Sequence, residues 1–283
     1  MNLQLIIVKL KGGLGNQMFQ YAIGKHLSLK RKCPLRLDLL YMKYDRRKKY
    51  ELDKLNIENK KTYFLEEVFY YFINFFHRII PFYKFIKQKS RKFNSSILNS
   101  HTPILYLDGY WQSEKYFEAI SEIIKKEFRI TARLNEENKK MLNKIQNCNA
   151  VVIHLRRRDY ICDAQINKKL GTCSMNYYKQ AIKLIENKVE FPKYFIFSDD
   201  IEWVKENFEL INNPIFVDIN TYENGYDDLR LMKNCKHFIL ANSTFSWWAA
   251  WLSENKHKVI IAPRNWIQSQ SDGCIVPESW IRI

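Results

Sequence analysis

The second half of the chain alternates short apolar, β-branched runs with segments of helical periodicity, and this alternation most restricts the fold. Strands are predicted at residues 150–155, 194–197, 215–218, 238–241 and 259–262, and helices at 175–185, 202–208, 227–233 and 244–252. Repeated strand–helix units form a parallel sheet with helices on both faces. The predicted class is therefore α/β.

The first half opens in the same way. An apolar run at Leu3–Leu10 precedes a glycine-rich turn and a helix that continues to about Leu29, and a second strand is expected at Leu35–Leu39. This is the start of a βαβ unit. Further along, the pattern predicts a surface loop at 43–61, a strand at 104–110, a helix at 114–128 and a polar stretch at 135–149.

Charge divides the chain near its middle. Of the net charge of +16, residues 1–140 hold +14, from 28 Lys and Arg against 14 Asp and Glu, while residues 141–283 hold +2, from 18 against 16. We therefore expect two α/β domains, 1–140 with a basic, aromatic-rich insert at about 43–100, and 141–283. Excess positive charge indicates a polyanionic or membrane-surface partner, or lysine that serves only solubility.

Residues 63–93 are almost continuously aromatic and basic. Such a stretch could be an amphipathic helix on an anionic membrane leaflet, or a helix packed within the first domain. The same interleaving also suits a nucleic-acid-binding protein, but that class would not explain the ordered second half.

Cysteines and hydropathy set the expected compartment. The six cysteines contain no Cys-x-x-Cys pair, which disfavours a zinc site. The N-terminal apolar run has no basic segment before it, and no window of about 18 residues lacks charge, so neither a signal peptide nor a membrane span is predicted. We expect a cytoplasmic protein, with any membrane contact peripheral and on the inner face.

Arginines cluster where the strand at 150–155 ends. His154, Arg156, Arg157, Arg158 and Asp159 follow one another there. Ligands of open α/β sheets bind at the carboxyl ends of strands, and guanidinium groups suit phosphate. The alternative is a solvated basic loop.

Two other strand ends carry polar residues. Asp199 and Asp200 follow the strand at 194–197 and could orient arginines, bind a nucleobase or ribose, or cap the next helix. The strand at 238–241 leads into a helix start formed by Asn242, Ser243, Thr244, Phe245 and Ser246. Hydroxyls and free N–H groups there could bind an anion, although Ser243 and Thr244 are also good helix caps.

The turn from Gly12 to Gln17 brings backbone close to a ligand because glycine adds no side chain. It matches neither G-x-G-x-x-G nor a Walker A loop, and it could be only structural. No Asp-x-Asp triplet occurs in the sequence. A diphosphate would therefore be neutralised by arginine and helix N-termini, without a metal.

Taken together, these segments resemble the bacterial α-1,2-fucosyltransferases of glycosyltransferase family 11. The resemblance is carried by Lys11–Tyr21, by His154-x-Arg156-Arg157-x-Asp159, and by Asp228–Leu252 with its Ala241–Trp248 core. It implies a GT-B fold, in which two Rossmann-like domains with parallel sheets face each other across a cleft, the donor bound by the second and the acceptor mostly by the first. It further implies transfer of L-fucose from GDP-β-L-fucose, with inversion, to the 2-hydroxyl of a terminal galactose on a glycan that could be lipid-linked, in surface polysaccharide or lipopolysaccharide synthesis. No metal, cofactor or nucleic acid is expected.

The resemblance also assigns residues. Arg156 would contact the β-phosphate, Asn16 would lie near the reacting hydroxyl, and Asp159 completes the catalytic set, with Asp159 or Asp163 as candidate base. Donor binding is assigned to Gly13, Gly15, His154, Arg157, Asp199, Asn242, Ser243, Thr244, Phe245 and Ser246. A related transferase for another nucleotide sugar or linkage remains the alternative.

Overall fold

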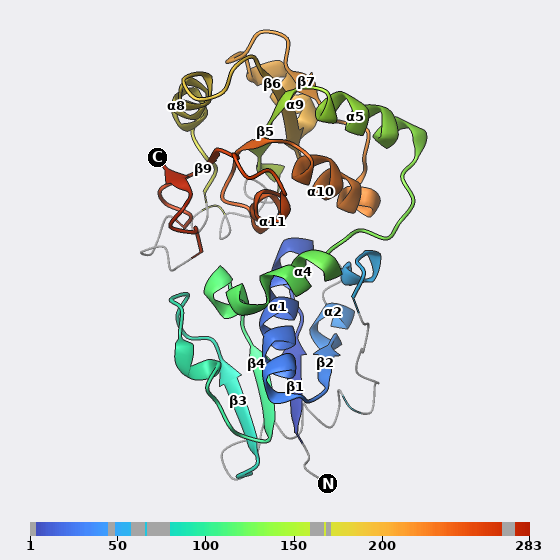
Figure 1. Cartoon of the computed structure of the whole chain (residues 1–283), viewed down its shortest axis with the longest axis vertical. Helices are drawn as coiled ribbons and strands as arrows, with labels where there is room; N and C mark the ends of the chain where they lie inside the picture. Colours follow the sequence, from blue (N-terminus) through green and yellow to red (C-terminus); the bar gives the residue numbers. More distant parts are fainter. Residues whose placement is uncertain are drawn as a thin grey trace. The chain divides into compact units, whose positions relative to one another are not determined.

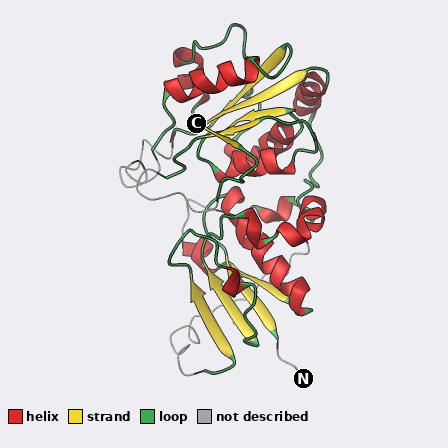
Figure 2. Ribbon diagram, turned by 60° about the vertical axis from the view of Figure 1, so that its left-hand side comes forward, coloured by secondary structure: helices red, strands yellow, loops and turns green. Residues whose placement is uncertain are grey.

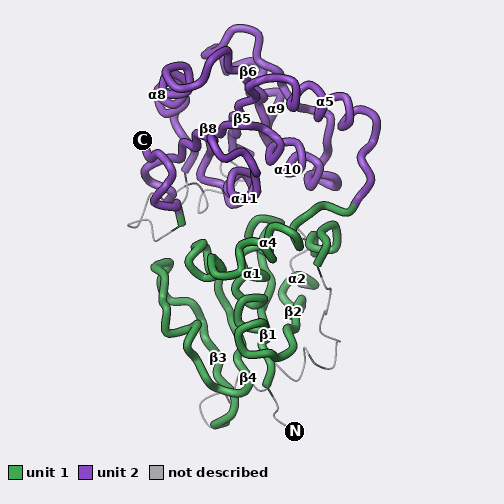
Figure 3. Tube along the Cα trace, in the orientation of Figure 1, with its two compact units in different colours: residues 1–131, 273–275 green, residues 132–272, 276–283 purple. Residues whose placement is uncertain are grey.

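The computed structural model describes residues 4–44, 49–57, 66, 80–158, 167, 171–267 and 275–283. The chain forms two compact units, residues 1–131 with 273–275 and residues 132–272 with 276–283 (Figure 3). A division between residues 140 and 141, as expected from the sequence, would cut helix α5 (Glu136–Gln146), which belongs wholly to unit 2.

Unit 1 is built on a parallel sheet of four strands in the order β2-β1-β4-β3. The strands are β1 (Leu5–Lys9), β2 (Leu35–Asp38), β3 (Tyr83–Lys87) and β4 (Ile104–Asp108). Helix α1 (Leu14–Arg31) crosses one face of this sheet (Figure 1). Gly24 allows the close approach, because a Cβ there would lie 2.6 Å from Val8 Cγ2 and 2.8 Å from Leu35 Cδ1.

Shorter elements are also found among the described residues of unit 1. They are α2 (Leu40–Tyr44), α4 (Ser121–Glu127) and the 3₁₀ turns η1 (Leu52–Lys54), η2 (Ser95–Ile97), η3 (Glu114–Tyr116) and η4 (Glu118–Ile120). The helix predicted over 114–128 is therefore wrong in its first half. Phe117, with φ at −141°, leaves helical backbone between the two 3₁₀ turns.

Two further predictions in unit 1 need correction. Strand β3 lies within the segment 63–93 that was expected to be helical, and the Phe85 ring on it packs 5.4 Å from the Tyr106 ring of β4. Residues 63–65 and 67–79 lie outside the described part of the chain. The loop predicted at 43–61 is not wholly on the surface, because Leu52 and Leu55 are buried and Leu55 forms an antiparallel bridge with Ile130.

Unit 2 contains a parallel sheet of six strands in the order β10-β9-β8-β5-β6-β7. The strands are β5 (Asn149–Leu155), β6 (Pro192–Ser198), β7 (Ile215–Phe216), β8 (His237–Ile239), β9 (Ile260–Ala262) and β10 (Ile281–Arg282). Helices α5, α8 (Met175–Glu186), α9 (Ile201–Asn207), α10 (Gly225–Lys233) and α11 (Thr244–Leu252) surround it, with the 3₁₀ turn η5 (Tyr222–Asn224) before α10. Figure 2 shows helices on both faces of the sheet.

Alternate residues of β5 supply the two faces of the core. Val151, Ile153 and Leu155 pack with Tyr178 of α8 and Val204 of α9 in one apolar cluster. The other residues of β5 point to the opposite face, as the strand geometry requires. His154 is thereby directed to the face on which the Phe245 ring of α11 lies, 6.4 Å from the imidazole.

Helix α5 and strand β10 were missed from the sequence. Residues 135–149 were expected as a polar stretch, but Asn135 caps a helix by accepting from Asn138 N at 2.8 Å, and Met141 and Ile145 bury its apolar side. The strand at 259–262 was expected to be the last, whereas β10 pairs with β9 beyond it. No helix in the described ranges is long and apolar enough to cross a membrane.

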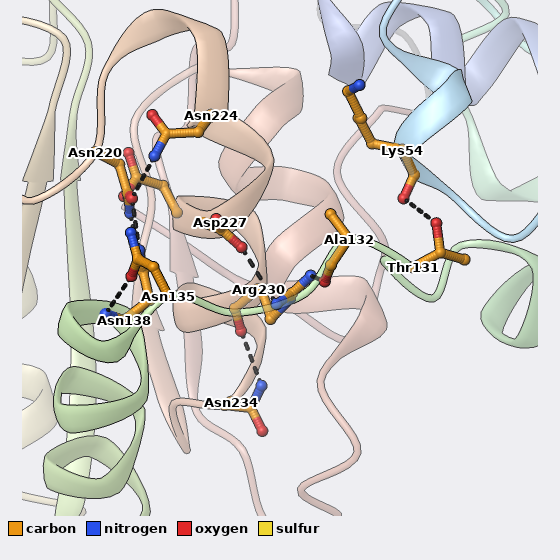
Figure 4. A network of polar contacts seen from close by, with 11 residues as sticks. Lys54, Thr131, Ala132, Asn135, Asn138, Asn220, Asn224, Asp227, Arg230 and Asn234 are labelled. Carbon is orange, nitrogen blue, oxygen red and sulfur yellow. Dashed lines mark hydrogen bonds and ion pairs between the residues drawn. The ribbon is translucent and has the colours of Figure 1, made fainter.

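A polar network holds the start of unit 2 (Figure 4). The Asn138 and Asn220 amides donate to each other at 2.8 and 3.0 Å, and Asn220 Nδ2 also donates to Asp228 Oδ1 at 2.7 Å. Arg230 donates to the carbonyl of Ala132 and forms an ion pair with Asp227 at 3.3 Å. The first residues of unit 2 are thus tied to helix α10.

Candidate active site

Three neighbouring strands of unit 2 end beside one another and deliver the predicted residues to one edge. Strand β5 lies between β6 and β8, with Leu155 opposite Ser198 and Ile153 opposite Ile239. The arginine segment, the aspartates after β6 and the start of α11 are therefore adjacent. The sequence predicted that each of these segments follows a strand, and the strand order brings the three strand ends together.

Arg156 and Arg157 have different environments. Arg156 Nε lies 3.3 Å from Asp199 Oδ2, with 27% of the arginine side chain exposed. Arg157 pairs with Asp200 at 3.2 Å, donates its backbone N–H to Asp199 Oδ1 at 2.8 Å, and places its guanidinium 3.4 Å from the centre of the Trp203 ring. Arg157 is therefore held by the protein itself through a carboxylate and a cation–π contact.

His154 is a buried, neutral imidazole. Burial, and secondarily the charge of Arg156, lower the pKa of His154 to about 3. Its Nδ1 has no hydrogen-bond partner among the described residues. A buried polar atom without a partner calls for an explanation, and a bound ligand is one.

Helix α11 begins directly beside His154. Ser243 is its N-cap residue, and its side chain makes no capping bond, although its carbonyl accepts from Trp247 N at 3.0 Å. Helix geometry leaves the N–H groups of Thr244, Phe245 and Ser246 without an acceptor inside the helix. An N-terminus of this kind suits an anion.

Asn242 connects loops at the same edge. Its Nδ2 donates to Gly171 O at 3.1 Å and to Trp266 O at 3.3 Å, and its side chain is buried. In this structure, the Asn242 side chain thus binds two loops of unit 2.

The glycine-rich turn of unit 1 follows β1. Gly12 has φ at +81°, which favours glycine, and Gly13 is the N-cap residue of α1. Gly15 is buried inside the first turn of the helix. The side chain of Gln20 holds the turn in place. Its Oε1 accepts from Lys11 N at 3.0 Å, and its Nε2 donates to Lys11 O at 3.2 Å.

Asn16 projects from the start of α1 and is half-buried. Its Oδ1 accepts from Gln112 Nε2 at 2.7 Å, and Gln112 Oε1 accepts from Arg91 Nη1 at 2.9 Å. Gln112 and Arg91 were not predicted as site residues. No sequence pattern connects either of them to Asn16.

A charged cluster that sequence analysis also missed occupies the carboxyl edge of the unit 1 sheet. Asp108, at the end of β4, lies 2.6 Å from Lys11 Nζ and 3.3 Å from Lys9 Nζ. Burial raises the pKa of Asp108, but the two lysines outweigh burial and hold it below its usual value. Lys11 Nζ also lies 4.9 Å from the centre of the Tyr110 ring.

Some predicted residues lie outside the description. Asp159 and Asp163, the candidate bases, are not among the described residues. Arg158 is described and is exposed to solvent. Within the described ranges, no group of three or more His, Cys, Asp or Glu could hold a metal ion.

Comparison with known families decides the assignment. Residues 2–283 match the family Glycosyl transferase family 11. The chain belongs to glycosyltransferase family 11. This confirms the resemblance that the three sequence segments indicated.

The chain is similar over its whole length to two Escherichia coli proteins. One is named alpha-1,2-colitosyltransferase, with 36% identity over 295 residues and 99% of each chain covered. The other is the O-antigen biosynthesis glycosyltransferase WbnK, with 31% identity over 304 residues, 97% of this chain and 99% of WbnK. Human galactoside alpha-(1,2)-fucosyltransferase 1 is 28% identical over 159 residues, which cover 53% of this chain and 44% of the human protein.

Solved structures share the fold at low identity. The structure of POFUT1 in complex with GDP has a TM-score of 0.52 and 14% identity, covering 92% of this chain and 99% of that one. POFUT1 in complex with GDP-fucose gives 0.50 with the same identity and coverage. With a parallel α/β sheet in each unit, the family 11 chain has the predicted GT-B type fold.

Proposed function

We propose that this family 11 glycosyltransferase transfers L-fucose from GDP-β-L-fucose to the 2-hydroxyl of a terminal galactose on a glycan. Unit 2 holds the donor and unit 1 the acceptor. Its products are surface polysaccharide or lipopolysaccharide chains. The whole-length similarity to WbnK, which is named for O-antigen biosynthesis, supports this setting.

The observation that carries the proposal is the set of possible anion-binding groups at the carboxyl edge of the unit 2 sheet. Arg156, the unpartnered Nδ1 of His154 and the start of α11 come together there. A guanidinium and free helix N–H groups suit a diphosphate. The neutral imidazole of His154 can donate one hydrogen bond to the diphosphate without adding a positive charge to the site.

This arrangement fits a displacement with inversion. When the bond between fucose and phosphate breaks, negative charge grows on the departing β-phosphate. In enzymes, hydrogen-bond donors already directed at such a charge are usually the largest single contribution to lowering the barrier. We assign stabilisation of this negative charge to Arg156. Residues at the helix start contribute to it as well, namely Ser243, Thr244, Phe245 and Ser246. Arg157, Asp199 and Asn242 hold the surrounding loops, and no metal is required.

A second donor is favoured by the similarity to the E. coli protein named alpha-1,2-colitosyltransferase. Colitose is L-fucose without its 3-hydroxyl, so one phosphate site and one linkage would serve both sugars. The alternative activity is therefore transfer of colitose from the corresponding GDP-linked sugar, again to a 2-hydroxyl.

A transfer assay distinguishes the two. GDP-fucose and GDP-colitose are each supplied with lactose, N-acetyllactosamine or galactosyl-N-acetylgalactosamine, and the product linkage is determined. Transfer of fucose in an α-1,2 linkage, unaffected by EDTA, supports the proposal. Transfer from GDP-colitose alone supports the second donor, and transfer from neither GDP-sugar argues against both.

Arg156→Ala tests the anion site itself. We expect kcat to fall by roughly 10²–10³, equivalent to about 2.7–4 kcal/mol, because one charge-stabilising donor is lost. Arg156→Lys should also be impaired, since lysine lacks the planar fork. Arg158→Ala, at the exposed neighbouring arginine, is the matched control. Near-normal turnover of a folded Arg156→Ala protein would remove Arg156 from the mechanism.

A further inference from the structure

The side-chain amide of Asn16 stands at the end of a chain of hydrogen bonds within unit 1. Arg91 Nη1 donates to Gln112 Oε1 at 2.9 Å, and Gln112 Nε2 donates to Asn16 Oδ1 at 2.7 Å. Arg91 follows β3, Gln112 follows β4, and Asn16 lies in the first turn of α1. Three separate segments thus meet at one amide.

The orientation of both amides follows from the chemistry of arginine. A guanidinium carries only donors, so Gln112 must turn its oxygen toward Arg91. The NH2 group of Gln112 then faces Asn16, and Asn16 must meet it with its own oxygen. If either amide were flipped, two donor groups or two acceptor groups would face each other.

The NH2 group of Asn16 is consequently directed away from Gln112. It lies over Gly12, since a Cβ on Gly12 would be only 2.5 Å from Asn16 Nδ2. The glycine leaves open the space that this NH2 group occupies. The turn before α1 therefore presents a donor, while the oxygen of Asn16 is already engaged.

The segment that carries Gln112 is held firmly. Trp111 has φ at +54°, an uncommon conformation for a bulky residue. Gln88 Oε1 accepts from Tyr110 N at 2.8 Å and from Trp111 N at 3.1 Å, which secures this backbone. Strained backbone of this kind is found preferentially at functional sites.

We propose that Gln112, anchored by Arg91, is a positioning residue that fixes Asn16 as a hydrogen-bond donor to the sugar substrate. The inference rests on the proposed function and on the placement of Asn16 near the reacting hydroxyl, which the family resemblance implies. It also means that the Asn16 oxygen does not receive the proton of that hydroxyl.

Gln112→Glu tests the orientation. The carboxylate keeps the contact with Arg91 but can only accept, so Asn16 must turn its NH2 toward residue 112 and present its oxygen to the substrate. We expect kcat to fall about 10- to 100-fold, by analogy with the loss of the hydrogen-bond partner of a metal ligand, while the KM for the donor stays unchanged. Gln112→Met removes the hydrogen bond to Asn16 without reversing the orientation of the Asn16 amide. Its loss in kcat should therefore be smaller. Gln180→Glu, exposed on α8, is the matched control.

A double variant separates positioning from an independent role. Because Gln112 acts through Asn16, combining Gln112→Glu with Asn16→Ala should be no slower than Asn16→Ala alone. If the losses in kcat of the two single variants multiply in the double variant, the proposal is wrong. Thermal unfolding of each variant identifies any loss that comes from misfolding.

NMR of the side-chain amides supplies a measurement that is independent of transfer. The Asn16 NH2 resonances, assigned by their loss in Asn16→Ala, should show one proton shifted downfield in Gln112→Glu, where it gains a carboxylate acceptor. Unchanged resonances would overturn the inference. A wild-type enzyme that transfers neither sugar would contradict the proposed function only, and NMR would still decide the role of Gln112.

Discussion

At the scale of single residues, the burial of His154 makes the stability of the protein depend on pH. Its folded pKa of about 3 lies below the unfolded value near 6.5. Below pH 6.5 the unfolded chain therefore binds a proton at His154 that the folded chain does not, and the contribution of His154 to stability falls as the pH decreases toward 3.

His154→Gln should remove this part of the pH dependence. Between pH 7 and 5 we expect the wild type to lose about 2 kcal/mol through His154, a loss that the variant lacks. Urea unfolding at the two pH values measures the difference. His257→Gln, at an exposed histidine, should keep the wild-type slope, and equal slopes for all three proteins would contradict a neutral buried His154.

Single residues at strand ends were predictable because sequence adjacency places them. Arg156 directly follows β5, and Ser243 comes four residues after the end of β8. The contact between Gln112 and Asn16 was not, since it joins residues 96 positions apart. Only the fold brings these two side chains together, and glutamine side chains carry no distinguishing pattern.

At the scale of elements, helix-to-sheet distance is set by small residues. Gly24 of α1 lies against Val8 and Leu35, whereas nothing lies within 4 Å of a Cβ at Gly225, the first residue of α10. Both glycines are helical, so the same change has opposite consequences in the two places.

Gly24→Ala should destabilise the protein by about 1–3 kcal/mol, because overpacking forces α1 away from the sheet. Gly225→Ala should stabilise it by about 0.4–1 kcal/mol, because alanine restricts the unfolded chain. Chemical denaturation of both variants provides the comparison. A stabilising Gly24→Ala would mean that α1 is not packed closely on β1 and β2.

The elements that could be predicted from the sequence are those whose apolar pattern is not interrupted by polar residues. Helix α11 has the bounds expected from the sequence, Thr244–Leu252, because its aromatic residues repeat at helical spacing. Helix α5 was missed because its few buried residues are separated by asparagine and lysine. Strand β3 was missed because its lysines and aromatics match a helical pattern equally well.

At the scale of the whole molecule, the positive charge is concentrated in the first half of the sequence. Lys84, Lys87 and Lys89 are exposed along and after β3, and the nearby Phe82 is 49% exposed. Basic and aromatic side chains together favour an anionic membrane surface. We therefore expect peripheral, salt-sensitive binding to such a surface.

Sedimentation with vesicles that contain an anionic lipid tests this expectation. Changing Lys84, Lys87 and Lys89 to serine should weaken binding by about 1 kcal/mol per lysine. The same change at Lys179, Lys183 and Lys188, exposed in unit 2, is the control. Vesicle binding that does not depend on salt concentration, or that falls equally in both triple variants, would argue against a membrane-binding surface on unit 1.

The short strand β10 determines which backbone groups the edge of the unit 2 sheet exposes. Its two residues, Ile281 and Arg282, pair with β9, and Ile283 N donates to Ala262 O at 3.2 Å. Without them β9 would become the outer strand, with an uncovered row of backbone donors and acceptors that could pair with another copy. Pairing with β10 therefore protects the β9 edge from pairing with another copy.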